Sequence, residues 1–405
     1  MSRIAGVITQ PGVNATELLY FGLFVMQYGG TKSAGIVSTA DHSFLPKTGP
    51  GLLTDVFSKE DIGYLKSQIS IGFCGFGQSL PMVVSSECGD MAISFDGPDD
   101  LLWQFVNKLG RISGDLEHSL VSIAKECFGS YAIIISARDK IYALRGDGRR
   151  PLCFGKIGDN QYVIASQENA ISTIEGRYSR NIEPGEMVIF GAKRHRSVRF
   201  ISFQRCAHEI IFTQSPASYW NKRSIWGLRS NIGHTLGEAV LQIGNHVDLI
   251  YPIPHGGHPY AFGVYEMMKD SGVIFNPQGV LKATYSGQVM IGIEQKLTLA
   301  APDELKGRSV VVVNDTLQSG YETEYVVGLC QKAGAKEVHV ATASLALSYC
   351  DFGDEVPSDL IGQRRNWAEI ALKLGATSFT TLRPNQIIKS IGVRSNVFCT
   401  QCLRP

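Results

Sequence analysis

A polar stretch that follows four consecutive valines is the part of the chain best suited to chemistry. Residues 310–313 are all valine, and residues 314–320 read Asn-Asp-Thr-Leu-Gln-Ser-Gly before an apolar-periodic segment. This pattern predicts a buried parallel strand, a polar turn, and a helix that Gly334 ends before a second strand at 337–341. Backbone N–H groups at a helix N-terminus bind phosphate, and the carboxylate of Asp315 suits a ribose diol. The stretch therefore indicates a βαβ unit with a ligand-binding loop.

Length and composition predict a globular chain of two or three domains. The 405 residues are 44% hydrophobic and 19% charged, with a formal net charge of +1, which favours neither nucleic acid nor an anionic membrane as a partner. The apolar run at 18–26 is too short to span a bilayer and no basic segment precedes it, so we expect a cytoplasmic protein. Nine cysteines, an odd number, disfavour a disulfide framework and leave metal ligands as an alternative.

The predicted pattern of secondary structure changes near residues 200–220. The first part is β-rich, and the second alternates strands and helices. Predicted strands of the first part are 4–8, 70–76, 91–95, 130–136, 140–144, 152–156, 162–166 and 187–190, and predicted helices are 101–109, 116–127 and one that Thr16 caps and that runs to residue 26. Predicted elements of the second part are helix 224–243, strand 249–253, loop 254–259 and a helix to residue 269.

A basic run at Lys193, Arg194, His195, Arg196 and Arg199 has two interpretations. It could be an anion or nucleic-acid patch, or a solvated turn. The run is brief and lies between two predicted strands, which favours the solvated turn.

Several segments resemble the glutamine amidophosphoribosyltransferase family, which catalyses the first committed step of purine synthesis. Residues 20–27, 33–36, 149–152, 182–186 and 333–338 occur in the family's order and span nearly the whole chain. The resemblance implies an α+β N-terminal-nucleophile αββα sandwich over 1–205, the glutaminase-like domain. It also implies an α/β type I phosphoribosyltransferase domain over 206–405, which ends in a cluster-binding tail.

The glutaminase residues of the family are replaced in this chain. Ala5 stands where the family has its nucleophilic cysteine, Gly75 where an arginine binds the glutamine carboxylate, and Asp96 where an asparagine completes the oxyanion hole. Ser2 lies three residues too early to serve as the nucleophile, and Cys74 is better explained as a buried strand cysteine. We therefore expect no glutamine hydrolysis.

Several of the family's transferase residues are also replaced in this chain. The family's pyrophosphate loop reads Pro-His-Gly-Gly at 254–257, and its catalytic loop reads Lys-Ala-Thr-Tyr at 282–285. The remaining candidate contacts to a nucleotide or sugar phosphate, with Mg²⁺ if a phosphoribosyl ligand binds, are Asp315, Thr316, Gly320, Lys282, Lys296 and His255.

Glu322 stands where the resemblance places a phosphate of the ligand, in the first turn of the predicted helix. Its carboxylate is either a built-in phosphate mimic that fills the site or a support for the helix dipole, worth about 0.3–1 kcal/mol. Both interpretations remain open.

Four cysteines match the positions that hold an iron–sulfur cluster in the bacterial and plant type of the family. The resemblance implies a [4Fe–4S] cluster on them, although four thiolates could also bind zinc or be inert core residues. These residues are Cys206, Cys350, Cys399 and Cys402.

Three functions are consistent with this pattern. The leading hypothesis is a catalytically silent homologue that acts as a binding or regulatory subunit, either in a homo-oligomer or with an active paralogue. The second is a repurposed enzyme that acts on a phosphorylated sugar or nucleoside in the C-terminal pocket. The third, an ammonia-dependent amidophosphoribosyltransferase, ranks last because of Glu322.

Overall fold

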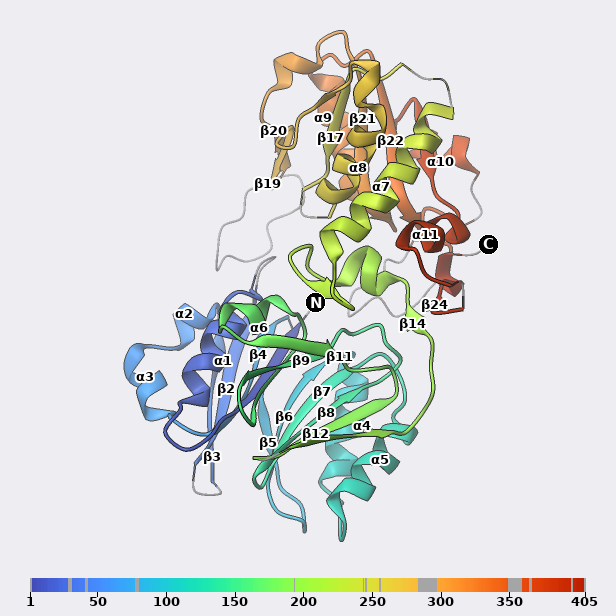
Figure 1. The fold of residues 1–405 in the computed structure, drawn as a ribbon. Helices are drawn as coiled ribbons and strands as arrows, with labels where there is room; N and C mark the ends of the chain where they lie inside the picture. Colours follow the sequence, from blue (N-terminus) through green and yellow to red (C-terminus); the bar gives the residue numbers. More distant parts are fainter. Residues whose placement is uncertain are drawn as a thin grey trace. The chain divides into compact units, whose positions relative to one another are not determined.

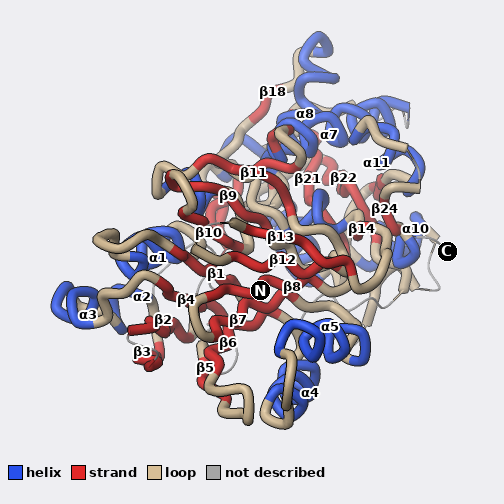
Figure 2. The backbone as a smooth tube through the Cα atoms, turned by 60° about the horizontal axis from the view of Figure 1, so that its bottom comes forward, coloured by secondary structure: helices blue, strands red, loops and turns tan. Residues whose placement is uncertain are grey.

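A computed structural model describes most of the chain, and its described residues form two compact units. The units comprise residues 1–209 with 218–221, and residues 210–217 with 222–405. Figure 1 gives their elements and Figure 2 separates helices from strands. The described residues are 2–27, 31–40, 43–76, 80–192, 194–242, 244, 246–254, 256–282, 297–348, 359–363, 366–394 and 396–403.

The first unit packs two antiparallel sheets face to face and covers them with helices. One sheet has the order β11-β9-β10-β1-β4-β2-β3 and the other β13-β12-β8-β7-β6-β5. Their strands are β1 (Arg3–Ile8), β2 (Ser33–Ala40), β3 (Ser43–Pro50), β4 (Ile69–Gly75), β5 (Met82–Val84), β6 (Met91–Asp96), β7 (Ala132–Ala137), β8 (Lys140–Arg145), β9 (Cys153–Gly158), β10 (Gln161–Ala165), β11 (Arg177–Asn181), β12 (Glu186–Phe190) and β13 (His195–Arg199). The helices are α1 (Ala15–Phe24), α2 (Leu53–Val56), α3 (Lys59–Tyr64), α4 (Asp99–Leu109), α5 (Leu116–Glu126) and α6 (Asn169–Thr173).

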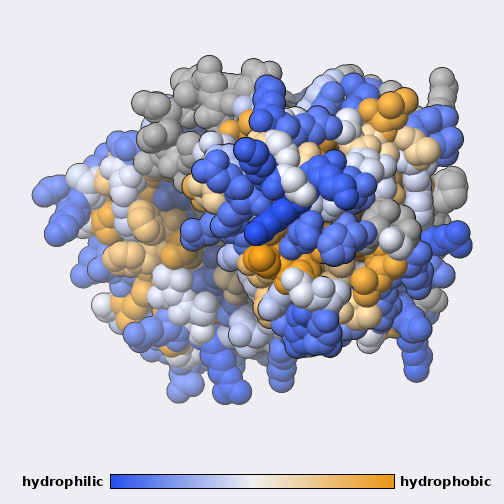
Figure 3. Space-filling model, turned by 90° about the horizontal axis from the view of Figure 1, so that it is seen from above, coloured by the Kyte–Doolittle hydropathy of each residue, from blue (hydrophilic) through white to orange (hydrophobic). Residues whose placement is uncertain are grey.

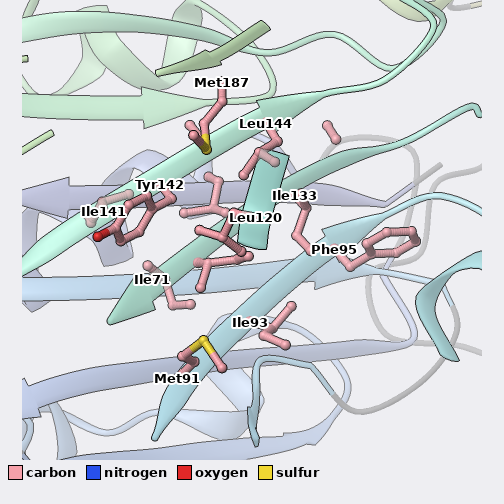
Figure 4. Close-up of a cluster of buried hydrophobic side chains, with 14 of the residues drawn as sticks. Ile71, Met91, Ile93, Phe95, Leu120, Ile133, Ile141, Tyr142, Leu144 and Met187 are labelled. Carbon is pink, nitrogen blue, oxygen red and sulfur yellow. The ribbon is translucent and has the colours of Figure 1, made fainter. Parts of the chain in front are cut away.

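Period-2 alternation along β1 explains the layers of this unit. Ile4 and Ile8 enter the core between the sheets, whereas Ala5 and Val7 enter the cluster beneath α1. The core between the sheets continues through Ile71, Ile133 and Leu144 to Leu120 of α5, as Figure 4 shows. The outcome is an αββα sandwich.

Two local predictions about the first unit were wrong. Asn14, not Thr16, caps α1, because its Oδ1 accepts from the Thr16 backbone N–H at 3.2 Å. The basic run is not a turn, because residues 195–199 form the edge strand β13, paired with β12. Exposed basic side chains on an edge strand discourage pairing with other chains, and Arg196 forms an ion pair with Glu117.

The second unit is built on a parallel sheet of order β18-β17-β21-β22-β23. α9 and α10 cover the face that carries Val310 and Val312, and Figure 1 shows α7 and α8 in front of the sheet. The strands are β17 (Leu249–Pro252), β18 (Ile274–Phe275), β21 (Ser309–Leu317), β22 (Glu337–Leu345) and β23 (Ser378–Thr381), with β19 (Val280–Lys282) and β20 (Leu297–Leu299) as a separate hairpin. The helices of this unit are α7 (Ile225–Gln242), α8 (His258–Met268), α9 (Tyr321–Lys332), α10 (Trp367–Lys373) and α11 (Pro384–Ile391). Short strands of the chain outside the three large sheets are β14 (Arg205–Cys206), β15 (Tyr219–Trp220), β16 (Arg223–Ser224) and β24 (Phe398–Cys399).

The glycines inside α7 have a packing role. A Cβ on Gly233 would lie 2.2 Å from the Tyr260 carbonyl oxygen of α8, and a Cβ on Gly263 would lie 2.0 Å from the Ser230 carbonyl oxygen. α7 and α8 therefore approach backbone to backbone, which outweighs the low helix propensity of glycine. The predicted helix 224–243 is confirmed as α7.

The face in Figure 3 is mainly hydrophilic, with small hydrophobic patches between the charged side chains. Among the described helices, none combines the length and apolarity that crossing a bilayer requires.

Candidate functional site

The predicted polar turn begins later than expected, because β21 extends through Leu317. Asn314, Thr316 and Leu317 pair with Thr342, Ser344 and Leu345 of β22. The Thr316 hydroxyl lies 2.9 Å from the Ser344 hydroxyl. Because this cross-strand hydrogen bond satisfies both hydroxyls, polar residues can continue the buried strand. The βαβ unit itself, β21-α9-β22, is confirmed.

Asp315 is the central acid of this site. Its Oδ1 accepts from the Thr316 N–H at 2.5 Å, and a Cβ on Gly256 would lie only 1.9 Å from its Oδ2. The predicted pyrophosphate loop therefore packs directly against the predicted ribose-binding acid. Burial raises the pKa of Asp315 to about 6; the Arg229 guanidinium opposes this rise, and the Glu322 carboxylate adds to it.

The start of α9 is shaped by Gly320 and tied to β21. Gly320 has φ of 85°, in the left-handed region that favours glycine. Asn314 Nδ2 donates to the Thr323 hydroxyl at 3.2 Å. Glu322 occupies the first turn, as predicted, and its charge acts on the Asp315 carboxyl.

The other predicted contacts are only partly described. Lys282 ends β19, paired in register with Leu297 of β20, whereas His255 and Lys296 lie outside the described residues. The structure thus brings Asp315, Thr316 and Gly320 into one strand-to-helix connection.

Position 5 in the first unit is enclosed by backbone. Ala5 is 1% exposed and pairs with Gly72 of β4 on one side and Ala165 of β10 on the other. The strand continues back to Arg3, opposite Cys74. Ser2 lies against Gly75, where a Cβ would be 2.5 Å from the Ser2 Cα, so the segment before Ala5 fills the space beside Gly75.

Asp96 and Cys74 each have a partner within this region, although Asp96 Oδ2 and Arg150 Nη2 make no hydrogen bond to a described residue. The Asp96 carboxylate forms a buried ion pair with Arg150 at 3.1 Å. Burial raises the pKa of the Cys74 thiol to about 12, and its Sγ donates to the Leu23 carbonyl oxygen at 3.7 Å. A thiol with this pKa is protonated at neutral pH and is a poor nucleophile.

Two arginines of these sites were not anticipated from the sequence. Arg150 lies 54 residues from Asp96. Arg229, buried in α7, donates to the Ile210 and Gln214 carbonyl oxygens at 2.8 Å and influences Asp315. An arginine in the middle of an otherwise apolar helix stripe was the available signal for Arg229.

The cysteines predicted as cluster ligands are partly described. The structure describes Cys206, Cys399 and Cys402, of which Cys206 and Cys402 are buried, and Cys350 lies outside the described residues. No group of three or more His, Cys, Asp or Glu side chains within the described ranges is arranged to hold a metal. The Cys402 carbonyl oxygen accepts from the Leu347 and Ser348 N–H groups at 2.9 and 3.3 Å, which joins the tail to the segment leading to Cys350.

Comparison with known proteins finds relatives that match this chain over nearly its whole length. No protein-family model matches the chain. The amidophosphoribosyltransferase of Methanocaldococcus jannaschii is 26% identical, with 100% of this chain and 96% of that protein covered. The Bacillus subtilis enzyme is 26% identical over 100% of this chain and 94% of the relative, and Arabidopsis thaliana chloroplastic amidophosphoribosyltransferase 1 is 29% identical over 98% and 77%. The chain is thus homologous to amidophosphoribosyltransferases over nearly its whole length.

Solved structures of amidophosphoribosyltransferases confirm the predicted fold. The B. subtilis glutamine phosphoribosylpyrophosphate amidotransferase, complexed with ADP and GMP, superposes with a TM-score of 0.86 at 25% identity, covering 99% of this chain and 96% of that one. A second structure, of the allosteric regulatory enzyme of purine biosynthesis, has the same TM-score at 24% identity and supports the fold. The first unit thus has the N-terminal-nucleophile glutaminase fold and the second the type I phosphoribosyltransferase fold.

Replacing Asp315 by asparagine should stabilise the protein at neutral pH. Because burial raises the pKa of Asp315 from 3.8 to about 6, the folded state binds this proton more tightly than the unfolded chain, and stability falls as the pH rises through that interval. Asparagine cannot ionise and keeps an acceptor for the Thr316 N–H. The free energy of unfolding of Asp315→Asn, relative to that of the parent, should therefore be about 2–3 kcal/mol higher near neutral pH than at acid pH. Urea unfolding of both proteins from about pH 4 to 7 measures this gain. A difference in stability that stays constant with pH would contradict the assignment.

Proposed function

We propose that this chain is a catalytically silent amidophosphoribosyltransferase homologue that acts as a binding or regulatory subunit. In this proposal residues 1–205 are a glutaminase-like domain and residues 206–405 a phosphoribosyltransferase-like domain. The observation that carries it is Ala5, a buried alanine with a paired strand on each side.

Glutamine hydrolysis of the N-terminal-nucleophile type needs a thiolate and the free α-amine of the same residue as its base. Ala5 supplies no thiolate, and Arg3 and Ile4 precede it within β1, so its amide nitrogen is a peptide N–H. At Gly75, where the family has an arginine, Ser2 occupies the neighbouring space. These features support loss of the glutaminase reaction.

The transferase site is proposed to bind without efficient transfer. A phosphoribosyl diphosphate would bring several negative charges next to Asp315 and Glu322, which repel it. We assign Glu322 as a phosphate mimic that occupies the N-terminus of α9. Asp315, Thr316, Gly320, Lys282, Lys296 and His255 are the proposed contacts for a nucleotide or sugar phosphate, with Mg²⁺ if the ligand carries a phosphoribosyl group.

A second candidate function has one observation in its favour. An acid with a pKa of about 6, such as Asp315, exchanges protons near neutral pH and suits general acid–base catalysis. A repurposed enzyme acting on a phosphorylated sugar or nucleoside would use this group. Ammonia-dependent transfer remains the third alternative, and Glu322 disfavours it.

We also propose that Cys206, Cys350, Cys399 and Cys402 hold a [4Fe–4S] cluster, with zinc as the alternative metal. Two observations support this group: four thiolates are the donor set of a [4Fe–4S] centre, and the Cys402 carbonyl oxygen is hydrogen-bonded to the residues just before Cys350. A cluster there would anchor the tail. Assembly as a homo-oligomer or with an active paralogue, in the cytoplasm, completes the proposal.

The purified protein should hydrolyse no glutamine and release no pyrophosphate from phosphoribosyl pyrophosphate with either glutamine or ammonia. The B. subtilis relative serves as the positive control. Ala5→Cys should not restore glutamine hydrolysis, because a cysteine at position 5 still lacks a free α-amine. Turnover of either substrate near the usual enzymatic range of about 1–1000 per second would contradict the proposal.

Glu322→Thr should bind phosphoribosyl pyrophosphate at least about tenfold more tightly than the parent, because it removes a charge from the proposed phosphate position. Titration calorimetry with Mg²⁺ measures the two affinities. Glu324→Thr, two residues further along the same helix, is the matched control for net charge. Equal affinities of Glu322→Thr and the parent would reduce Glu322 to a helix-dipole residue.

Anaerobic purification should give about four irons per chain and a broad absorption near about 400 nm, as expected for a four-cysteine cluster. Cys399→Ser should lose this absorption and make the C-terminal tail more sensitive to limited proteolysis. Cys330→Ser, which changes a buried cysteine of α9 outside the proposed set, should keep the iron. Zinc, or no metal, in the parent would overturn the cluster assignment.

A further inference from the structure

A cavity of about 1580 Å³ lies within the second unit and shares no residue with the Asp315 site. It is lined by residues at the ends of β22 and β23, by the first residues of α10, by residues along α11, and by the tail residues Thr400 and Leu403. Figure 1 shows α10, α11 and the C-terminus on the same side of this unit. In open α/β sheets, ligands bind beyond the carboxyl ends of the strands, which is where this cavity lies.

The inner wall of the cavity is apolar and preformed. Leu345, Leu382, Ile388 and Leu403 line it and are each at most 7% exposed. Trp367, at the start of α10, also lines the cavity and is 46% exposed. A fixed aliphatic wall with a partly exposed indole suits a planar ring, because stacking on an aromatic side chain contributes about 1–3 kcal/mol per base.

A buried hydroxyl in the wall lacks a partner. Thr381 lines the cavity and is 7% exposed, and its Oγ1 makes no hydrogen bond within the described part of the chain. Leaving such a group unsatisfied costs about 1–3 kcal/mol, and buried polar atoms of this kind call for an explanation. A polar group of a bound molecule would provide the missing hydrogen bond.

The charge at the cavity favours an anion. Arg383 is the N-cap of α11 and Lys389 lies in its last turn; both line the cavity, and the structure gives neither an ion pair with a described residue. The carboxylate in the lining, Glu369, is held by the Asn366 side-chain amide at 3.0 Å. The N-terminus of the eight-residue helix α11 adds its positive dipole end.

We propose that this cavity is a nucleotide-binding site in which Trp367 stacks on the base, Arg383 and Lys389 bind the phosphate, and Thr381 hydrogen-bonds the polar part. The site is separate from the Asp315 connection, and the inference does not depend on whether the chain is catalytically silent. A ligand here would contact the tail through Thr400 and Leu403, so binding would be sensed by the segment that carries Cys399 and Cys402.

Titration of the full-length protein with ADP, followed by tryptophan fluorescence and calorimetry, tests this site. The parent should bind ADP with a fluorescence change, and Trp367→Phe should lose that change while calorimetry still detects binding. The double variant Arg383→Gln/Lys389→Gln should raise the Kd at least about tenfold, since hydrogen bonds to a charged group are worth about 1.5–3 kcal/mol each. Adenosine and inorganic phosphate, titrated separately, should each bind more weakly than ADP.

Lys332→Gln/Lys336→Gln removes the same charge from the exposed end of α9 and the turn after it, away from the cavity, and should leave the Kd unchanged. Thermal unfolding confirms that all variants fold. An ADP fluorescence change that survives in Trp367→Phe would overturn the proposal. The proposal would also be overturned if the control pair raised the Kd for ADP as much as Arg383→Gln/Lys389→Gln does, or if the parent bound no ADP up to about 1 mM.

Discussion

The pairing of β1 on both of its edges is the constraint on which the first unit depends. β4 and β10 take up the backbone groups of residues 4–8, and alternate side chains feed two separate cores. Moving this strand by one residue would exchange the residues of both cores. The backbone at position 5 is therefore held by pairing on both sides, which supports the structural role proposed for Ala5.

The end of β21 in the second unit is polar although it is buried. Asn314, Asp315 and Thr316 are each at most 9% exposed, yet a ladder of side-chain hydrogen bonds satisfies them. Burial of a carboxylate beside another carboxylate opposes folding. A site that retains this arrangement keeps polar groups at a cost in stability, which is typical of sites selected for binding.

The sequence predicted the parts of the structure that periodicity determines. The valines at 310–313, with Gly334 after the helix, were sufficient for β21-α9-β22, and the order of motifs was sufficient for both folds. Partners distant in sequence were beyond prediction, since Arg150 meets Asp96 only when β6 and the segment after β8 pack together. The cap of α1 was missed for a local reason: Asn14 and Thr16 are both good capping residues two positions apart, and the structure uses Asn14. The cavity beside α11 was missed because segments far apart in the sequence line it and none of them carries a motif.

The raised pKa of Asp315 couples any anionic ligand at that position to protons. A phosphate that binds beside this carboxyl would raise its pKa further, because the negative charge favours the neutral acid. Near neutral pH the protein would then take up a proton as the ligand binds, and affinity would fall as the solution becomes more alkaline. The heat of binding would consequently depend on the ionisation enthalpy of the buffer, because the buffer supplies the proton that Asp315 takes up when the ligand binds.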